Sequence, residues 1–168
     1  MAGSCSFDVT STVDLQEVDN ALNQARKEVV QRYDFKGSKA AIDFSRTDST
    51  ITLTADDEFK MQALWEIVQG RMLKRNVPVK NLTLGEIEHG GNDTVRRVIT
   101  LQQGITSDAS RAIVKFLKDR KLKKVQAAIQ ADQLRISSPS KDELQTVMQL
   151  LRAEDFGIAL QFGNFRDQ

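Results

Sequence analysis

The sequence has few of the residues on which catalytic and metal sites depend. Its 168 residues include one cysteine, Cys5, and one histidine, His89. Cys5 has no second cysteine with which to form an internal disulfide, and no His/Cys cluster has metal-ligand spacing. His89 stands beside glycines in an expected loop, so it has no catalytic partner in sequence. We therefore expect a protein that is not an enzyme and that uses no metal and no cofactor.

Long apolar runs and a strong charge of one sign are also absent. No stretch of 18 apolar residues occurs, and the N-terminus lacks a basic region followed by an apolar one. We therefore expect a cytoplasmic protein with no membrane partner, in which the single cysteine stays reduced. The net charge is +1, but residues 1–90 hold 11 basic and 14 acidic side chains and residues 91–168 hold 13 and 9. A polyanion is expected to meet the second half first.

Hydrophobic periodicity divides the first half into a regular order of elements. Asp14 with Glu17 resembles a capping box, and Asp56 or Asp57 is expected to cap a second helix. The expected elements are a strand over residues 7–13, a helix over 15–33, a hairpin over 40–53, a helix over 57–75 and a strand over 79–84. This order is β-α-β-β-α-β, the order of a ferredoxin-like unit.

The second half repeats this order after a break at residues 89–93. Ser140 with Glu143 gives another capping box. The expected elements are a strand over 95–102, a helix from Thr106 or Ser107, strands over 125–129 and 134–136, a helix from Ser140 and a strand over 158–162. We therefore predict an α+β fold, a tandem duplication of two ferredoxin-like units with antiparallel sheets, with repeats over residues 1–90 and 91–168.

Four stretches carry a resemblance to a known family. They are residues 6–9, 13–21, 32–39 and 163–166, which read SFDV, VDLQEVDNA, RYDFKGSK and GNFR. Together they resemble the YajQ family of bacterial nucleotide-binding proteins over nearly the whole chain. The resemblance implies that the C-terminal strand of each repeat is exchanged, so that residues 79–88 join the second sheet and residues 158–165 join the first.

The resemblance also implies a class of ligand. Members of the family bind nucleotides, some act as cyclic di-GMP effectors with a transcription regulator, and others are linked to tRNA or GTP. The segment over residues 32–39 combines cations, two aromatic rings and a glycine, which suit base stacking and phosphate binding. The candidate nucleotide-binding residues are Arg32, Tyr33, Phe35, Lys36, Gly37, Ser38 and Lys39, with Phe165 and Arg166 at the chain end.

The same residue types also have ordinary structural uses. Tyr33 and Phe35 can belong to the core, Gly37 can serve a turn with positive φ, and the lysines can be solvated. The triplet at residues 37–39 is not a phosphate loop of the Walker type, because it follows a helix instead of preceding one. The binding and the structural interpretation of this segment both remain open from the sequence.

A second group of cations lies near the end of the third expected helix. Six cations fall within ten residues and are opposed by Asp119 only. The candidate phosphate contacts of a nucleic acid are Arg97, Lys115, Lys118, Lys121, Lys123 and Lys124. The alternative is a solvated helix end, because cations are favoured at helix C-termini. The central strands lack exposed rings, so stacking of the RNA-recognition type is not expected.

Three functions remain open from the sequence. The first is a regulator that binds a purine nucleotide or cyclic di-GMP and changes its contact with a partner protein. The second is RNA or tRNA association through the basic second half. The third is a module for protein interaction in which the basic surfaces are only solvated.

Overall fold

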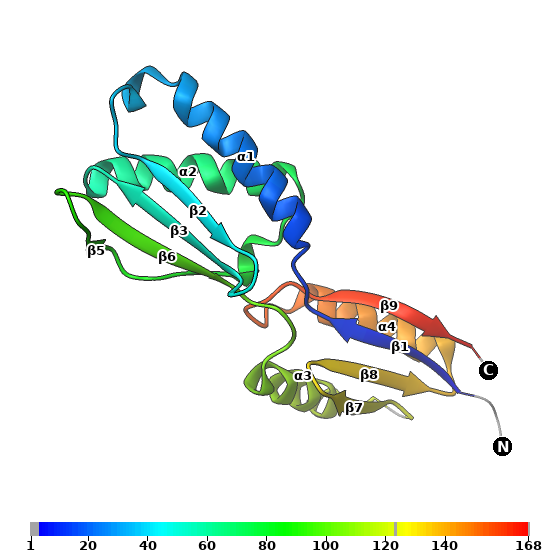
Figure 1. Cartoon of the computed structure of the whole chain (residues 1–168). Helices are drawn as coiled ribbons and strands as arrows, with labels where there is room; N and C mark the ends of the chain where they lie inside the picture. Colours follow the sequence, from blue (N-terminus) through cyan, green and yellow to red (C-terminus); the bar gives the residue numbers. More distant parts are fainter. Residues whose placement is uncertain (1–3, 123, 168) are drawn as a thin grey trace. The chain divides into compact units, whose positions relative to one another are not determined.

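The computed structural model describes residues 4–122 and 124–167. The chain forms two compact units. One is the continuous stretch from Val13 to Gln102, and the other combines the residues up to Thr12 with those from Gln103 onward (Figure 1). The chain therefore passes between the units twice.

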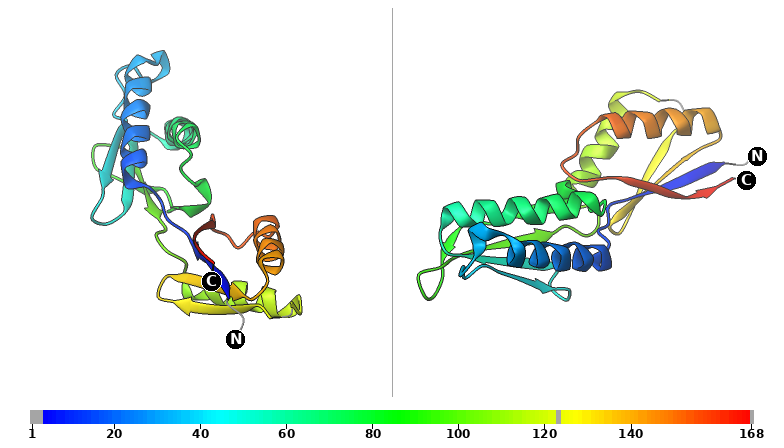
Figure 2. Two further views of the ribbon diagram at one scale, coloured as in Figure 1. Left: turned by 90° about the vertical axis from the view of Figure 1, so that its right-hand side faces the viewer. Right: turned by 90° about the horizontal axis from the view of Figure 1, so that it is seen from above.

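The continuous unit is an antiparallel sheet with two helices on one face. Its strands follow the order β2-β3-β6-β4, and β5 also pairs with β6. The elements are α1 (Leu15–Gln31), the 3-10 helix η1 (Tyr33–Phe35), β2 (Ala41–Ser45), β3 (Thr50–Ala55), α2 (Glu58–Lys74), the 3-10 helix η2 (Val79–Asn81), β4 (Leu82–Leu84), β5 (Glu88–His89) and β6 (Val95–Leu101). The helices lie side by side (Figure 2), and Arg71 of α2 pairs with Glu28 of α1 at 2.9 Å.

Side-chain caps set the starts of these helices. Asp14 accepts hydrogen bonds from the backbone N of Gln16 at 3.0 Å and of Glu17 at 3.4 Å. Asp57, one of the two predicted caps, accepts from the backbone N of Lys60 at 2.7 Å. Each carboxylate satisfies N–H groups that the helix itself leaves without an acceptor. The predicted helix starts are confirmed.

The second unit has the same layers. Its sheet order is β7-β8-β1-β9, with all pairs antiparallel. The elements are β1 (Cys5–Thr10), α3 (Ser107–Asp119), β7 (Gln126–Gln130), β8 (Gln133–Ser138), α4 (Lys141–Ala153) and β9 (Gln161–Arg166). Thr106 and Ser140 cap the helices by accepting from Ala109 N and Glu143 N. Alternate strand residues such as Phe7 and Ile136 pack with the helices in one core.

The prediction that the last strands of the repeats are exchanged is wrong. β4 pairs with β6 in the sheet of β2 and β3, and β9 pairs with β1 in the sheet of β7 and β8. The first strands are the exchanged ones: β1 lies in the sheet of the second repeat and β6 in the sheet of the first. The periodicity of a strand fixes which face is buried but not which sheet receives it, because pairing partners lie far away in sequence.

A buried carboxylate joins three strands of the second unit. Asp8 on β1 is 5% exposed and accepts hydrogen bonds from Arg135 Nε on β8 at 3.0 Å and from Asn164 Nδ2 on β9 at 2.6 Å. Burial raises the pKa of Asp8, but the hydrogen bonds from Arg135 and Asn164 and the charges of Arg135 and Arg166 outweigh it, so the pKa is lowered. Asp8 therefore stays ionised and fixes β1 between its neighbours.

None of the helices among residues 4–122 and 124–167 is both long enough and apolar enough to span a membrane.

Candidate functional site

The segment over residues 32–39 connects α1 to β2 through η1. Phe35 is buried, and Arg32 Cζ and Lys60 Nζ lie 5.7 Å and 5.2 Å from the centre of its ring. Tyr33 is 88% exposed. The two rings that the sequence offered for base stacking therefore differ. Phe35 belongs to the core, which was the alternative to base stacking, whereas the ring of Tyr33 is open to a ligand.

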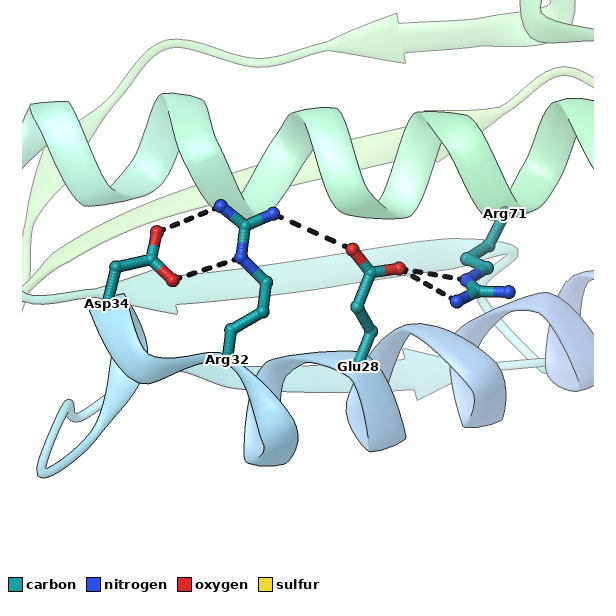
Figure 3. A network of polar contacts seen from close by, with 4 residues as sticks. All are labelled: Glu28, Arg32, Asp34 and Arg71. Atoms are coloured by element: carbon teal, nitrogen blue, oxygen red, sulfur yellow. Dashed lines mark hydrogen bonds and ion pairs between the residues drawn. The ribbon is translucent and has the colours of Figure 1, made fainter.

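Arg32 belongs to a chain of ion pairs (Figure 3). Its Nε and Nη2 donate to the two carboxylate oxygens of Asp34 at 3.0 Å and 2.9 Å, and its Nη1 lies 3.6 Å from Glu28. Glu28 in turn accepts from Arg71 at 3.0 Å and 2.9 Å. The hydrogen bond from Arg32 lowers the pKa of Asp34 and raises that of Arg32 itself. A phosphate at Arg32 has to compete with two carboxylates, which weakens this residue as a ligand.

The next residues are held against the corner between β3 and α2. The Asp56 carboxylate accepts from Ser38 Oγ and, at 3.1 Å, from the backbone N of Lys39. Gly37 provides the turn before them, with φ of +73°. The hydrogen bond from Ser38 is the largest cause of the lowered pKa of Asp56. Ser38 therefore acts as an anchor of the segment, and the anchor determines where Lys39 leaves the backbone.

Lys39 reaches across to the loop between β5 and β6. Its Nζ donates to the carbonyl oxygen of Asn92 at 2.7 Å. We call the adjoining depression the Lys39 hollow, which has a volume of about 630 Å³. Its lining consists of Lys39, Thr54, His89, Gly90, Gly91, Asn92, Thr94 and Arg96. Two cations, a histidine and a glycine-containing loop therefore surround one open space.

The loop that forms one wall of the hollow is tightly folded. Thr94 Oγ1 donates to the carbonyl oxygen of Gly91 at 2.6 Å, and Gly90 N donates to the carbonyl oxygen of Thr94 at 2.8 Å. A Cβ atom on Gly90 would meet Thr94 Oγ1 at 2.8 Å, so a larger residue there would force the Thr94 side chain to shift. Asn92 lies in the left-handed region with φ of 58°. This folding leaves room beside the loop for a ligand.

Arg96 also lines the hollow, although it is not among the candidate residues from the sequence. It lies on β6 and is exposed, with Glu88 on β5 at 3.5 Å. Its only signal in the sequence is its position shortly after the break at residues 89–93. The pairing of β6 with β3 places Arg96 opposite Thr54, which is why it shares the hollow with Lys39.

The remaining residues proposed for nucleotide binding lie elsewhere. Lys36 is exposed in the connection after η1. Phe165 and Arg166 are exposed on β9, in the other unit, where they line a smaller hollow of about 230 Å³ with Lys141 and Met148. The Phe165 ring lies 6.0 Å from that of Phe7. The nine candidates are thus divided between the two units.

The residues proposed for nucleic-acid contacts are divided in the same way. Lys115 and Lys118 are exposed on α3, and Lys121 and Lys124 are exposed after it, while Lys123 lies outside the described residues. Arg97 belongs to the continuous unit and is opposite Leu53 in the sheet, on the buried face of β6. Its Nε is buried and has no hydrogen-bond partner among the described residues. Arg97 is therefore not placed as an exposed phosphate contact would be.

Within the part of the chain that the structure describes, no three His, Cys, Asp or Glu side chains are placed together so as to hold a metal ion.

The fold and the hollow define a class: a protein of two ferredoxin-like units with a polar depression lined by cations. The chain belongs to the YajQ family, because residues 5–166 match the family described as "Nucleotide-binding protein YajQ-like". It is 47% identical to a "Nucleotide-binding protein" of Geotalea uraniireducens over 161 residues, or 96% of this chain and 98% of the relative. A protein of the same name from Chloroherpeton thalassium is 45% identical, with 99% and 100% covered. "Nucleotide-binding protein Mmc1_1670" of Magnetococcus marinus is 48% identical, with 96% and 99% covered.

Proposed function

We propose that this protein binds a nucleotide, and that the phosphates of the ligand lie in the Lys39 hollow between Lys39 and Arg96. The observation that carries the proposal is that these two cations, 57 positions apart in sequence, line the same depression. Its volume of about 630 Å³ falls within the range of small-molecule sites. Ammonium and guanidinium groups are the usual protein ligands of phosphate.

The ligand that we place first is a purine nucleotide, with cyclic di-GMP as the leading candidate. The family resemblance supports this choice, and so does the exposed ring of Tyr33 in the segment that carries Lys39, because an exposed ring can stack on a base. Binding of this kind is non-catalytic and acts by changing the contact with a partner protein, such as a transcription regulator. The place of action is the cytoplasm.

Equilibrium binding of fluorescent cyclic di-GMP to the purified chain tests the proposal, with unlabelled GTP and bulk tRNA as competitors. Lys39→Ala and Arg96→Ala are each expected to weaken binding about ten- to hundred-fold, the loss of about 1.5–3 kcal/mol per charged hydrogen bond. Lys27→Ala is the matched control, because Lys27 is an exposed lysine of α1 outside the hollow. Equal affinity of all three variants would reject the hollow as the site.

RNA association is the alternative function. Its support is the group of exposed lysines on and after α3, namely Lys115, Lys118, Lys121 and Lys124. Each phosphate neutralised on a single strand contributes about −0.7 to the slope of log K against log salt concentration. Direct binding of tRNA with a steep salt dependence, weakened by replacement of these lysines, would favour this alternative, whereas a flat dependence would reject it.

A further inference from the structure

An apolar groove runs between α3 and the edge strand β7. One part has a volume of about 500 Å³ and is lined by Val114, Leu117, Lys118, Lys121, Leu122, Val125, Gln126 and Ala127. A second part of about 330 Å³ is lined by Arg111, Val114, Lys115, Lys118, Asp119 and Ile129. The two parts share Val114 and Lys118, so they are continuous along α3. We call this surface the α3–β7 groove.

The groove is an uncovered edge of the hydrophobic core. Ile129 pairs with Leu134 across the strands, and Ala127 pairs with Ile136. Directly opposed residues point to the same face of a sheet, and both partners on β8 are fully buried. Ile129 is nevertheless 51% exposed. Since β7 is at the end of the sheet, no described strand lies beyond it to narrow the opening.

The rim of the groove is cationic. Lys115, Lys118 and Lys121 are exposed, and their ammonium groups make no hydrogen bond or ion pair to another side chain among the described residues. Arg111 adds a fourth cation, which Asp108 pairs at 2.8 Å. Asp119 is the one acidic residue in the lining of either part. The floor of the groove is therefore aliphatic, and its rim carries uncompensated positive charge.

We propose that the α3–β7 groove docks an acidic segment of another protein, with aliphatic side chains on the groove floor and carboxylates beside Lys115, Lys118 and Lys121. Charge complementarity determines the sign of the occupant. A single-stranded nucleic acid suits the rim but not the floor, because no aromatic side chain lines either part of the groove for base stacking. A second copy of this chain would bring the same cations against one another in a symmetric contact.

The proposal concerns the second unit only and does not depend on nucleotide binding at the Lys39 hollow. It is tested on the full chain labelled with ¹³C in the isoleucine methyl groups. The probe is a synthetic 14-residue peptide. Leucine stands at the positions i, i+3, i+4 and i+7 that form one face of a helix, and glutamate stands at the other positions. A peptide with lysine in place of glutamate and a dodecauridine strand are the comparison probes.

The acidic peptide is expected to shift the methyl signal of Ile129 in a saturable way. The double variant Lys115→Glu/Lys118→Glu should weaken its binding about ten-fold, since two rim charges are reversed. Lys27→Glu/Lys74→Glu is the matched control, with two exposed lysines on the helices of the other unit, and its affinity should be unchanged. Ile129→Gln, which removes the Ile129 signal and is therefore measured by isothermal titration calorimetry, should also weaken binding while leaving every charge in place.

Four results would overturn the proposal. One is equal binding of the lysine peptide, which would remove the charge argument. Another is a shift of Ile129 by dodecauridine with displacement of the acidic peptide, which would assign the surface to RNA. The third is the absence of any shift of Ile129 with the acidic peptide at millimolar concentration. The fourth is a shift that the double variant does not weaken.

Discussion

The anchoring of Lys39 by Asp56 provides a sharp test of the proposed site, because Asp56 is outside the lining of the hollow. Replacement of Asp56 by Ala removes the acceptor for Ser38 Oγ and for the backbone N of Lys39. The Lys39 side chain keeps its charge in this variant. Any loss of nucleotide affinity is then caused by a change in the position of Lys39, because the residue itself is still present.

The size of the effect follows from these two hydrogen bonds. A hydrogen bond to a charged group contributes about 1.5–3 kcal/mol when it is buried. Asp56 is only half-buried, so we expect about 1–2 kcal/mol in total for ordering the segment. This corresponds to a loss of about five- to thirty-fold in affinity for cyclic di-GMP. The lowered pKa of Asp56 means that the anchor is present above about pH 4 and is lost as the pH falls through the folded-state value.

Amide hydrogen exchange and equilibrium binding, measured on the same samples, check this prediction. Exchange at the Lys39 amide should accelerate in Asp56→Ala, because this amide donates to the missing carboxylate. Asp48→Ala is the control, since Asp48 is an exposed carboxylate in the turn between β2 and β3. Faster exchange with unchanged affinity would refute the hollow as the nucleotide site, and unchanged exchange would refute the role of the anchor.

Three further predictions concern stability. Asp8→Ala should lower the free energy of unfolding by about 2–4 kcal/mol in urea titrations, because it leaves Arg135 unpaired. Since the pKa of Asp8 is lowered, this difference in stability should vanish as the pH falls well below 4. A difference that persists in acid would contradict the prediction. Phe35→Ala should cost about 3–5 kcal/mol and Tyr33→Ala almost nothing, and equal costs would refute their assigned burial. A fragment of residues 13–102 should fold alone by circular dichroism and cooperative melting, and a disordered fragment would contradict the independence of this unit.

The local elements were predictable because each depends on residues close together in sequence. Asp14, Thr106 and Ser140 cap helices at the expected positions, and the apolar periods of 2 and 3.6 match the buried faces of strands and helices. Glu88 was expected at the end of the preceding strand and His89 in a loop, whereas the structure places both in the short strand β5, because two residues carry no period of their own. Its pairing with β6 is a long-range property.

The candidate site was only partly predictable for the same reason. Lys39 was selected from its neighbours, and in the structure it lines the hollow. Phe35 was selected for its ring, but burial depends on Lys60 and the core beneath it, which the segment itself does not encode. Arg96 was not selected, because Lys39 is far from it in sequence, in the connection before β2. The two residues come close only because β6 pairs with β3 in the sheet.

The exchange of first strands explains why residues of both repeats share the hollow. Lys39 and Thr54 come from the first repeat, whereas Arg96 is near the start of β6, the first strand of the second repeat. β6 takes the central place beside β3 that β1 occupies in an unexchanged ferredoxin-like unit. Had the last strands been exchanged instead, β6 would pair with β8 and Arg96 would lie in the other unit, without Lys39. The duplication thus forms one polar hollow from two repeats, and its lining depends on which strand is exchanged.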